Sequence, residues 1–293
     1  MSWEVRTVKR LSVLLILASL IYAPAFVNAQ SKPLVNKVEH FFVISEDPER
    51  LFKLFRDVLQ LPVVWPYQRF GEFASGGLSL GNTVLEFLDF PFENEPRRRT
   101  KFKGIAFEPV VDADASVIEL KKRGIAHGEP QPFKIQAGGQ ERVGWINIQL
   151  TDLPPSDAFV FLCDYKSRER VVETRSTASQ EMVRRGGGPL GVLSLEEIVV
   201  GVRSVEEASG RWGRLLESRE RGAAPVFALR SGPRIRLVRA DAEGIQGIVV
   251  RVKSKKQAAQ FLAKNKMLSD SKAGGLAITP ESVGGLMITL VEE

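Results

Sequence analysis

The sequence contains one cysteine and two histidines, which narrows the chemistry that it can support. Cys163 is the only thiol in the 293 residues, so no disulfide can form within the chain. Because Cys163 lies in the apolar run from Ala158 to Tyr165, we expect a packed thiol rather than a nucleophile. The sequence contains no Ser-His-Asp order, zinc-ligand spacing, Walker loop or dinucleotide fingerprint. The stability of the fold must therefore come from its apolar cores.

A strong charge of one sign is also missing. The net charge is +6, and the residues before Gln30 contribute three basic side chains and one acidic one, which leaves about +4 for the rest. No aromatic platform is interleaved with basic residues, so nucleic acid is not an expected partner. One basic run, Arg97 to Arg99 with Lys101 and Lys103, lies between two strand-rich segments. We interpret it as a solvated connector, with an anion-attracting rim on a cleft as the alternative.

The first 29 residues have the composition of a secretory signal peptide. Arg6, Lys9 and Arg10 precede the apolar segment 11–27, and small residues stand at Val27-Asn28-Ala29. We predict cleavage after Ala29 and a secreted or periplasmic mature protein without stable membrane insertion. An uncleaved membrane anchor is the alternative. The segment 1–29 is excluded from the fold prediction.

The stretch from Val38 to Phe90 predicts one strand, one helix and three further strands. Val38–Ile44 is apolar on both faces and predicts a covered strand. Asp47-Pro48-Glu49 starts a helix, because Asp47 can cap the free amides and proline suits the first helical position. Gly81-Asn82 predicts a two-residue turn between the last two strands.

Two polar residues interrupt these apolar strands. His40 lies among Val38, Phe42 and Ile44 on one face of the first strand, and Glu86 lies between Val84 and Leu88 on the last. A carboxylate in such a strand needs water, a cation, a hydrogen-bond donor or a metal ion. We therefore expect His40 and Glu86 to face the same cavity.

The same strand–helix–strand unit recurs along the chain. The second unit spans 103–165, and the third and fourth begin with the strands at 195–202 and 247–252. We predict an α+β fold of four βαβββ units paired into two domains, at 36–165 and 194–293. The polar stretch 166–193, which contains Gly186-Gly187-Gly188, is predicted to be the linker.

This pattern resembles the vicinal-oxygen-chelate superfamily, which includes glyoxalase I, extradiol dioxygenases, fosfomycin-resistance enzymes and bleomycin-binding proteins. The pieces that carry the resemblance are VEHFFVISEDPERLFKLFRDVLQLP, TVLEFLDF, GIAFEPVVDADASVIELKKRG and FVFLCDY. The resemblance implies that two units curve into a cup, and that first and last strands hold a divalent metal ion there.

Carried over residue by residue, the resemblance implies His40, Glu86 and Asp164 as metal ligands, with Glu86 also able to move a proton. Gly104 stands where a histidine is common in the second unit, and the alignment at Asp164 can be one residue off. His127 is a remote substitute. In the second pair of units, Glu197, Arg236, Gly247 and Thr289 supply no ligand set, and this half is expected to be degenerate.

Two functions remain open at this point. The first is a metal-dependent lyase, isomerase or dioxygenase acting on a small oxygen-rich molecule, in which the metal polarises a carbonyl or stabilises an enolate. The second is a metal-free cup that sequesters a small molecule, lined by aromatic residues such as Trp65, Tyr67, Phe70 and Trp145. In the metal-free case, His40 and Glu86 form a hydrogen-bonded pair. A homodimer is compatible with either function.

Overall fold

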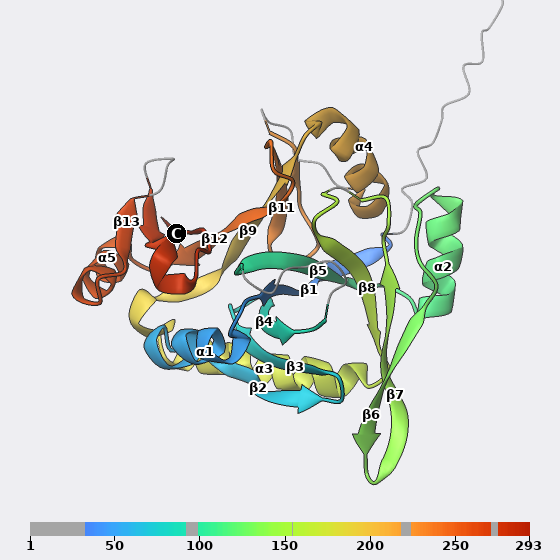
Figure 1. Cartoon of the computed structure of the whole chain (residues 1–293), viewed down its shortest axis with the longest axis horizontal. Helices are drawn as coiled ribbons and strands as arrows, with labels where there is room; N and C mark the ends of the chain where they lie inside the picture. The colour runs from blue at the N-terminus through green and yellow to red at the C-terminus, as the bar shows by residue number, and fades with distance from the viewer. Residues whose placement is uncertain (1–32, 92–98, 154, 218–223, 271–274) are drawn as a thin grey trace, which may run out of the picture. The chain divides into compact units, whose positions relative to one another are not determined.

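Two β-sheets carry the fold in the computed structural model, which describes residues 33–91, 99–153, 155–217, 224–270 and 275–293 (Figure 1). The expected signal peptide, its cleavage site after Ala29, and Arg97 and Arg98 of the basic run lie outside the described residues. Within those ranges, no helix is both long and apolar enough to cross a membrane. Contacts group Pro33–Glu293 into one compact unit.

The first sheet contains two βαβββ units. The first unit runs through β1 (Val35–Ile44), α1 (Pro48–Lys53), β2 (Val63–Phe70), β3 (Phe73–Ser79) and β4 (Val84–Asp89), and a π-helical turn (Leu54–Val58) follows α1. The second unit runs through β5 (Lys101–Pro109), α2 (Ala113–Lys122), β6 (Gln131–Ala137), β7 (Gln140–Gln149) and β8 (Phe159–Tyr165).

The second sheet repeats this order, with one strand fewer among the described residues of its first unit. Its first unit contains β9 (Val192–Val202), α4 (Val205–Leu216), β10 (Val226–Phe227) and β11 (Arg234–Arg239). Its second contains β12 (Gly244–Val252), α5 (Lys255–Lys264), β13 (Leu268–Asp270), β14 (Leu276–Ile278) and β15 (Ile288–Glu292), with a short 3-10 turn (Pro280–Val283) before β15. The predicted fold class, α+β with tandem units in two sheets, is confirmed.

Strand order shows how the units pair. The first sheet has the order β2-β3-β4-β1-β5-β8-β7-β6, and the second β10-β11-β9-β12-β15-β14-β13. In each sheet the two opening strands pair antiparallel at the centre, and each opening strand is parallel to the last strand of its own unit. His40 on β1 and Glu86 on β4 are therefore carried by neighbouring strands, as expected.

Local sequence explains where the helices begin. Asp47 accepts a hydrogen bond from the Arg50 amide at 2.9 Å, and Asp112 accepts one from the Ala115 amide at 2.9 Å. The buried side chains of α1 pack against β4, where Phe52 and Phe87 meet edge to face with ring centroids 5.7 Å apart. This packing fixes the outer face of β4 and directs Glu86 to the opposite face.

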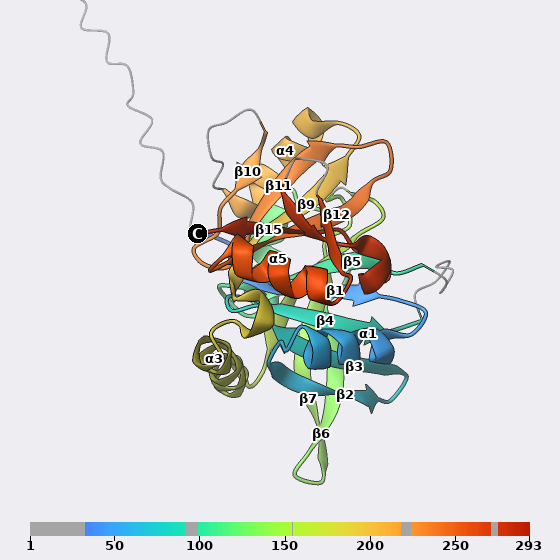
Figure 2. The same cartoon turned by 90° about the vertical axis from the view of Figure 1, so that its left-hand side faces the viewer.

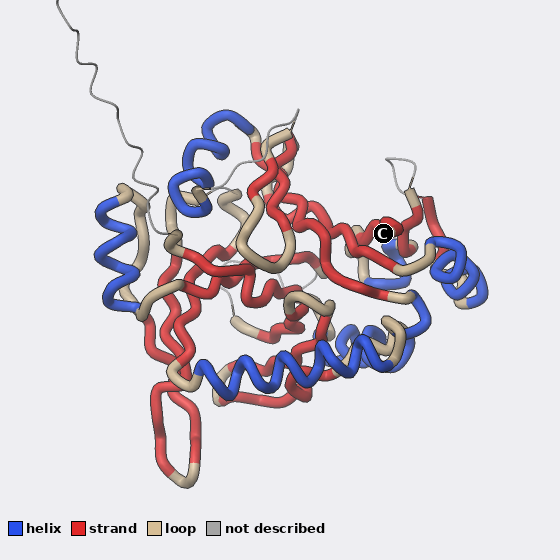
Figure 3. The backbone as a smooth tube through the Cα atoms, turned by 180° about the vertical axis from the view of Figure 1, so that it is seen from behind, coloured by secondary structure: helices blue, strands red, loops and turns tan. Residues whose placement is uncertain are grey.

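The stretch 166–193, predicted to be a polar linker, contains a long helix that the sequence analysis did not predict. Helix α3 (Arg168–Arg184) fills most of this stretch, and its Ala178 and Met182 are buried. It lies along β2 and β3 on the side opposite α1 (Figures 2 and 3). Its sequence is polar because one narrow stripe, rather than a broad face, contacts the sheet. The division into two domains itself stays a prediction.

The basic run also differs from its interpretation as a solvated connector. Lys101 and Lys103 belong to β5, and their ammonium groups lie 2.9 and 3.1 Å from carboxylate oxygens of Asp157. Lys103 is 8% exposed. The two lysines are therefore held within the sheet by a shared carboxylate.

Candidate functional site

A bulge in β1 turns two consecutive side chains into the first sheet's cup. Val38 pairs with Phe107 and His40 with Ala106 on β5, so Glu39 is the extra residue between them. The Thr83 hydroxyl donates to the carbonyl groups of Val38 and Glu39 at 3.3 and 3.4 Å. Because of the bulge, Glu39 and His40 lie on the same side, which strict alternation would not allow.

His40 lies between two carboxylates. Its Nδ1 contacts Oε2 of Glu39, and its Nε2 lies 3.3 Å from Oε2 of Glu86. Glu39 and His40 are 2% and 5% exposed, so water does not screen these contacts strongly. A protonated imidazole can donate to both carboxylates, whereas a neutral one can donate to one only. The expectation that His40 and Glu86 share a face is met by this contact.

Glu86 is also held by its neighbours on β2 and β3. The Ser75 hydroxyl donates to Glu86 Oε1 at 2.5 Å, and the indole of Trp65 donates to the same hydroxyl at 2.9 Å. One carboxylate oxygen thus accepts from Ser75 and the other faces His40. These hydrogen bonds from Trp65 to Ser75 and from Ser75 to Glu86 fix the carboxylate in position without a metal ion.

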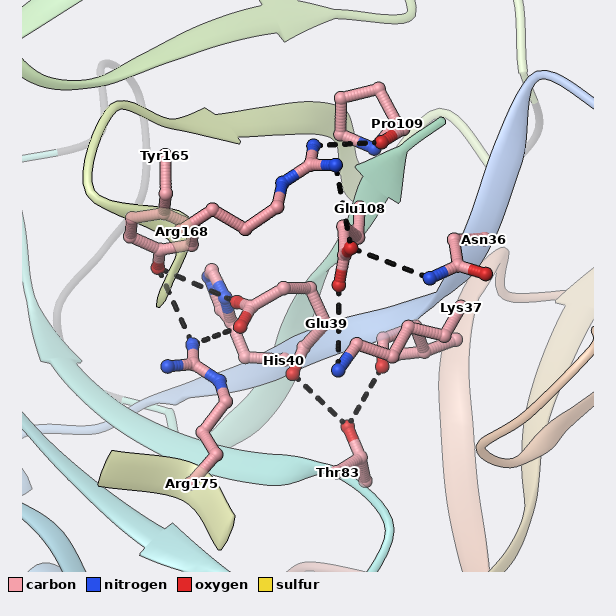
Figure 4. A network of polar contacts seen from close by, with 11 residues as sticks. Asn36, Lys37, Glu39, His40, Thr83, Glu108, Pro109, Tyr165, Arg168 and Arg175 are labelled. Atoms are coloured by element: carbon pink, nitrogen blue, oxygen red, sulfur yellow. Dashed lines mark hydrogen bonds and ion pairs between the residues drawn. The ribbon is translucent and has the colours of Figure 1, made fainter. Parts of the chain in front are cut away.

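Arg175 from α3 points toward Glu39 and Tyr165 in this cluster (Figure 4). Its guanidinium forms an ion pair with Glu39 Oε1 and lies 3.5 Å from the Tyr165 hydroxyl, which donates in turn to Glu39 Oε2 at 3.4 Å. The guanidinium also stacks over the rings of Trp65 and Tyr165, 5.7 and 5.4 Å from their centroids. Arg175 is 14% exposed, so the cluster contains a nearly buried cation.

The charges of this cluster stabilise one another. Burial by itself raises the pKa of Glu39, but Arg175 and His40 outweigh it and lower the pKa from its ordinary 4.5 to about 2. Burial lowers the pKa of Arg175, but the Glu39 carboxylate together with Tyr165 and Cys163 outweighs this effect, so the pKa is raised. Burial also raises the pKa of Cys163 and of Tyr165. Glu39 and Arg175 are therefore both ionised at neutral pH.

Asp164, the third expected ligand, lies on the other face of β8. Its Oδ2 accepts from the Ala113 amide at 3.0 Å and from Lys166 Nζ at 2.7 Å. It thus binds the start of α2, while its neighbours Cys163 and Tyr165 face the cup. A one-residue shift in a strand changes the face, and the structure does not bring Asp164 to His40 and Glu86.

The other predicted residues are placed as follows. Cys163 is buried at 1% exposure, as expected for a packed thiol. His127 lies in the loop after α2, where its Nδ1 is 2.8 Å from the Gly128 carbonyl. Tyr67 packs against Phe52, with ring centroids 5.9 Å apart, so it faces α1 and not the cup. In the second sheet, Arg236 donates to Glu197 at 2.6 Å.

The residues of the cup, as they stand, do not fit a divalent metal ion. Both ring nitrogens of His40 face carboxylates, and Glu39 already carries a guanidinium. A side chain at Gly104 would overlap the Phe42 ring and approach the Phe159 carbonyl oxygen to 2.5 Å, so no ligand can be placed there. Among the described residues, no group of three or more His, Cys, Asp or Glu side chains is arranged to hold a metal ion.

Aromatic rings form a continuous row beside the charged cluster. The row, defined here as Phe70, Phe73, Phe133, Trp145 and Tyr165, has successive ring centroids 5.4, 6.5, 5.4 and 6.2 Å apart. All five rings are half-buried. The Phe73–Phe133 contact joins β3 to β6, near the two edges of the sheet, so the row bridges the opening between those edges.

A separate groove of about 700 Å³ lies outside this cup. It is bounded by α3 on one side and by the π-helical turn and β2 on the other, and Arg56, Asp57, Glu173 and Thr177 are among its lining residues. None of Glu39, His40 or Glu86 lines it. Several of its charged residues are already paired, since Arg56 contacts Asp57 at 2.6 Å and Glu181 contacts both Arg184 and Arg185.

Sequence reasoning missed Glu39, Arg175 and Tyr165. The two consecutive polar residues Glu39-His40 in an apolar strand were a usable signal, because a bulge is the simplest way to give both a polar environment. Tyr165 could have been found as the neighbour of Asp164 on the alternate face. Nothing local marks Arg175 among the other arginines of α3.

Comparisons with known proteins support the fold. No family model matches the sequence, and no curated protein matches it. A hypothetical protein from Staphylococcus aureus superposes with a TM-score of 0.60 at 10% identity, over 89% of this chain and all of its own. Homoprotocatechuate 2,3-dioxygenase from Arthrobacter globiformis gives 0.54 at 13% identity, over 92% of this chain and 84% of that one.

A third similar structure is the 2,3-dioxygenase LapB from Pseudomonas sp. KL28, with a TM-score of 0.56 at 12% identity over 89% of this chain and 93% of that one. A variant of homoprotocatechuate 2,3-dioxygenase from B. fuscum, solved in complex with HPCA, gives 0.53 at 11% identity, over 88% of this chain and 71% of that one. These likenesses confirm the resemblance at the level of the fold. The chain therefore has the vicinal-oxygen-chelate fold that extradiol dioxygenases share.

Proposed function

We propose that the first cup binds a small aromatic molecule without a metal ion, and that the protein is a binding protein rather than a dioxygenase. The observation that carries this proposal is the row of half-buried aromatic rings that leads from Phe70 to Tyr165. Half-buried rings 5 to 7 Å apart are able to stack on a further ring, as aromatic pairs do.

The charged cluster supplies polarity at the inner end of the row. Tyr165 is both the last ring of the row and a hydrogen-bond partner of Glu39 and Arg175. An aromatic ligand with a hydroxyl or carboxylate group would place its ring on Trp145 and its polar group toward Tyr165 and Arg175. This division of apolar lining and few polar groups is typical of small-molecule sites.

Tryptophan fluorescence offers a direct test. Trp145 and Trp65 lie at the cup, whereas Trp212 is fully buried on α4. We expect HPCA, added to protein that has been treated with a chelator, to quench the fluorescence saturably. Trp145→Leu should weaken this binding about tenfold, equivalent to about 1.4 kcal/mol, because one aromatic stacking surface is lost.

Tyr67→Phe is the matched control, because Tyr67 packs against Phe52 on the far side of the sheet. It should leave the affinity unchanged. Quenching that requires added metal, or that is equal in the Trp145 variant and the wild type, would contradict the proposal.

A metal-dependent enzyme is the second candidate, favoured by the 3.3 Å separation of His40 and Glu86. In that case the purified protein would carry a stoichiometric divalent ion, and HPCA would be consumed with oxygen only when the ion is present. Elemental analysis together with oxygen uptake separates this function from metal-free binding.

A further inference from the structure

The carboxylates of the cup need a compensating cation. The side chain of Glu39 is 2% exposed and that of Glu86, on the other side of the His40 ring, is 13% exposed, so two acids lie in a poorly solvated space. Isolated buried charges are costly, and such groups are paired or coordinate metals. Here α3 supplies the positive charge from within the chain, as Arg175.

The geometry around His40 retains features of a metal site. Two ligands bonded to one ion at about 2.1 Å each lie roughly 3 to 3.5 Å apart, which brackets the 3.3 Å between His40 Nε2 and Glu86 Oε2. His40 Nδ1 contacts Glu39, and a carboxylate on the other ring nitrogen is the usual partner of a metal-binding histidine. Two features depart from such a site, namely the guanidinium beside Glu39 and the lack, among the described residues, of a third ligand arranged with His40 and Glu86.

The second sheet repeats the arrangement independently. Leu195 pairs with Val250 and Glu197 with Val249, so Glu196 is the extra residue of a bulge in β9, as Glu39 is in β1. Glu196 is also neutralised by arginine, since Arg251 Nε lies 2.8 Å from one oxygen and Arg234 Nη2 lies 2.6 Å from the other. In both sheets, a bulge carboxylate is paired with a guanidinium.

We propose that Arg175 is a built-in replacement for the divalent cation of this fold, and that it blocks a latent metal site formed by His40 and Glu86 with Glu39 behind them. Removing the guanidinium leaves these acidic groups without their cation and opens the space between Trp65 and Tyr165. A divalent ion then restores the charge balance. This inference concerns the charge balance among Glu39, His40, Glu86 and Arg175, and it does not depend on the binding of an aromatic ligand.

Metal-dependent rescue of stability tests the proposal. We expect Arg175→Ala to unfold at a lower temperature than the wild type in chelator, and saturating MnCl2 to raise its midpoint by about 5 °C or more, because the ion binds the folded state only. Wild-type protein should show no such rise. Arg175→Lys keeps the positive charge and should also show none. Adding His40→Ala to Arg175→Ala should abolish the rescue.

If Arg175→Ala does not fold in chelator, Arg175→Met, which keeps more of the side-chain volume, is purified with and without MnCl2. Folding of either variant with the ion alone supports the proposal. The proposal is overturned if MnCl2 stabilises neither variant, if it stabilises the wild type equally, or if the rescue survives the loss of His40. An HPCA titration of the wild type is unaffected by these outcomes, so the two proposals fail separately.

Discussion

The polar residues of the cup are held in place mainly by contacts between opposite charges. Glu39 accepts contacts from His40, Arg175 and Tyr165, and no apolar residue could replace it without leaving a buried guanidinium unpaired. A buried ion pair is a weak source of net stability, but the loss of one partner is expensive. The cluster therefore specifies one arrangement of β1, β8 and α3 more than it strengthens the fold.

Acid should weaken the protein through Glu39. Its pKa falls from 4.5 in the unfolded chain to about 2 in the folded one, so its contribution is fully present above about pH 4.5 and is lost as the pH falls toward 2. The shift corresponds to about 3 kcal/mol. Glu39→Gln should flatten this part of the curve of unfolding free energy against pH, measured by urea denaturation between pH 7 and pH 3.

The same substitution should cost about 3–5 kcal/mol at pH 7, because Arg175 is left without its counter-charge. Glu72→Gln, at an exposed position, is the control and should change neither the neutral stability nor the slope. An unchanged acid slope in the Glu39 variant would show that other carboxylates account for the acid sensitivity.

Among the elements, α3 supplies the cation of the cup. It closes the side of the cup opposite α1, with Ala178 packed near Val64 and Val84, and with the Ser179 hydroxyl donating to the Gly81 carbonyl at 2.7 Å. These contacts place Arg175 over Glu39. The docked position of this helix therefore decides which cation faces Glu39.

Docking of α3 can be broken at one position. Ala178 is 3% exposed, so Ala178→Glu forces an unpaired carboxylate into an apolar contact and should cost about 2–4 kcal/mol. We expect faster proteolysis within α3 and a change in tryptophan fluorescence as Arg175 leaves Trp65. Val183→Glu is the control on the same helix, because Val183 is 79% exposed. Equal proteolysis of the two variants would contradict this role of Ala178.

At the scale of the whole molecule, two sheets with the same central strand pairing differ in the polar residues that their opening strands carry. The first has a histidine between two glutamates and one arginine, and the second has Glu196 and Glu197 bound by Arg234, Arg236 and Arg251. Duplicated units thus preserve strand order and the bulge but not the polar groups. Sharing a strand order therefore does not by itself fix the polar residues that each sheet carries.

We also expect the whole protein to be exported. The apolar segment 11–27 and the small residues before Gln30 predict cleavage after Ala29. N-terminal sequencing of the native protein should begin at Gln30, and a variant with Ala29→Arg should be processed slowly or retained, since a large charged residue does not fit the cleavage pattern. An intact Met1 on the native protein would contradict this expectation.

The sequence by itself determined the repeated units, the faces of most strands and the proximity of His40 to Glu86. These depend on local sterics, since alternation decides the face of a strand residue and capping and turn residues decide where elements end. The face of Asp164 was within reach of the same reasoning, because its neighbour Tyr165 continues the alternation of Phe161 and Cys163.

Only the tertiary structure decided which charge occupies the cup. The bulge at Glu39 depends on the pairing of β1 with β5, and the contact of Arg175 with Glu39 joins residues far apart in the chain. α3 is too polar for its periodicity to reveal which side docks, and none of its arginines differs locally from the rest. A buried guanidinium needs a carboxylate partner, and Arg175 finds this partner only in the folded protein, because Glu39 is far from it in the sequence.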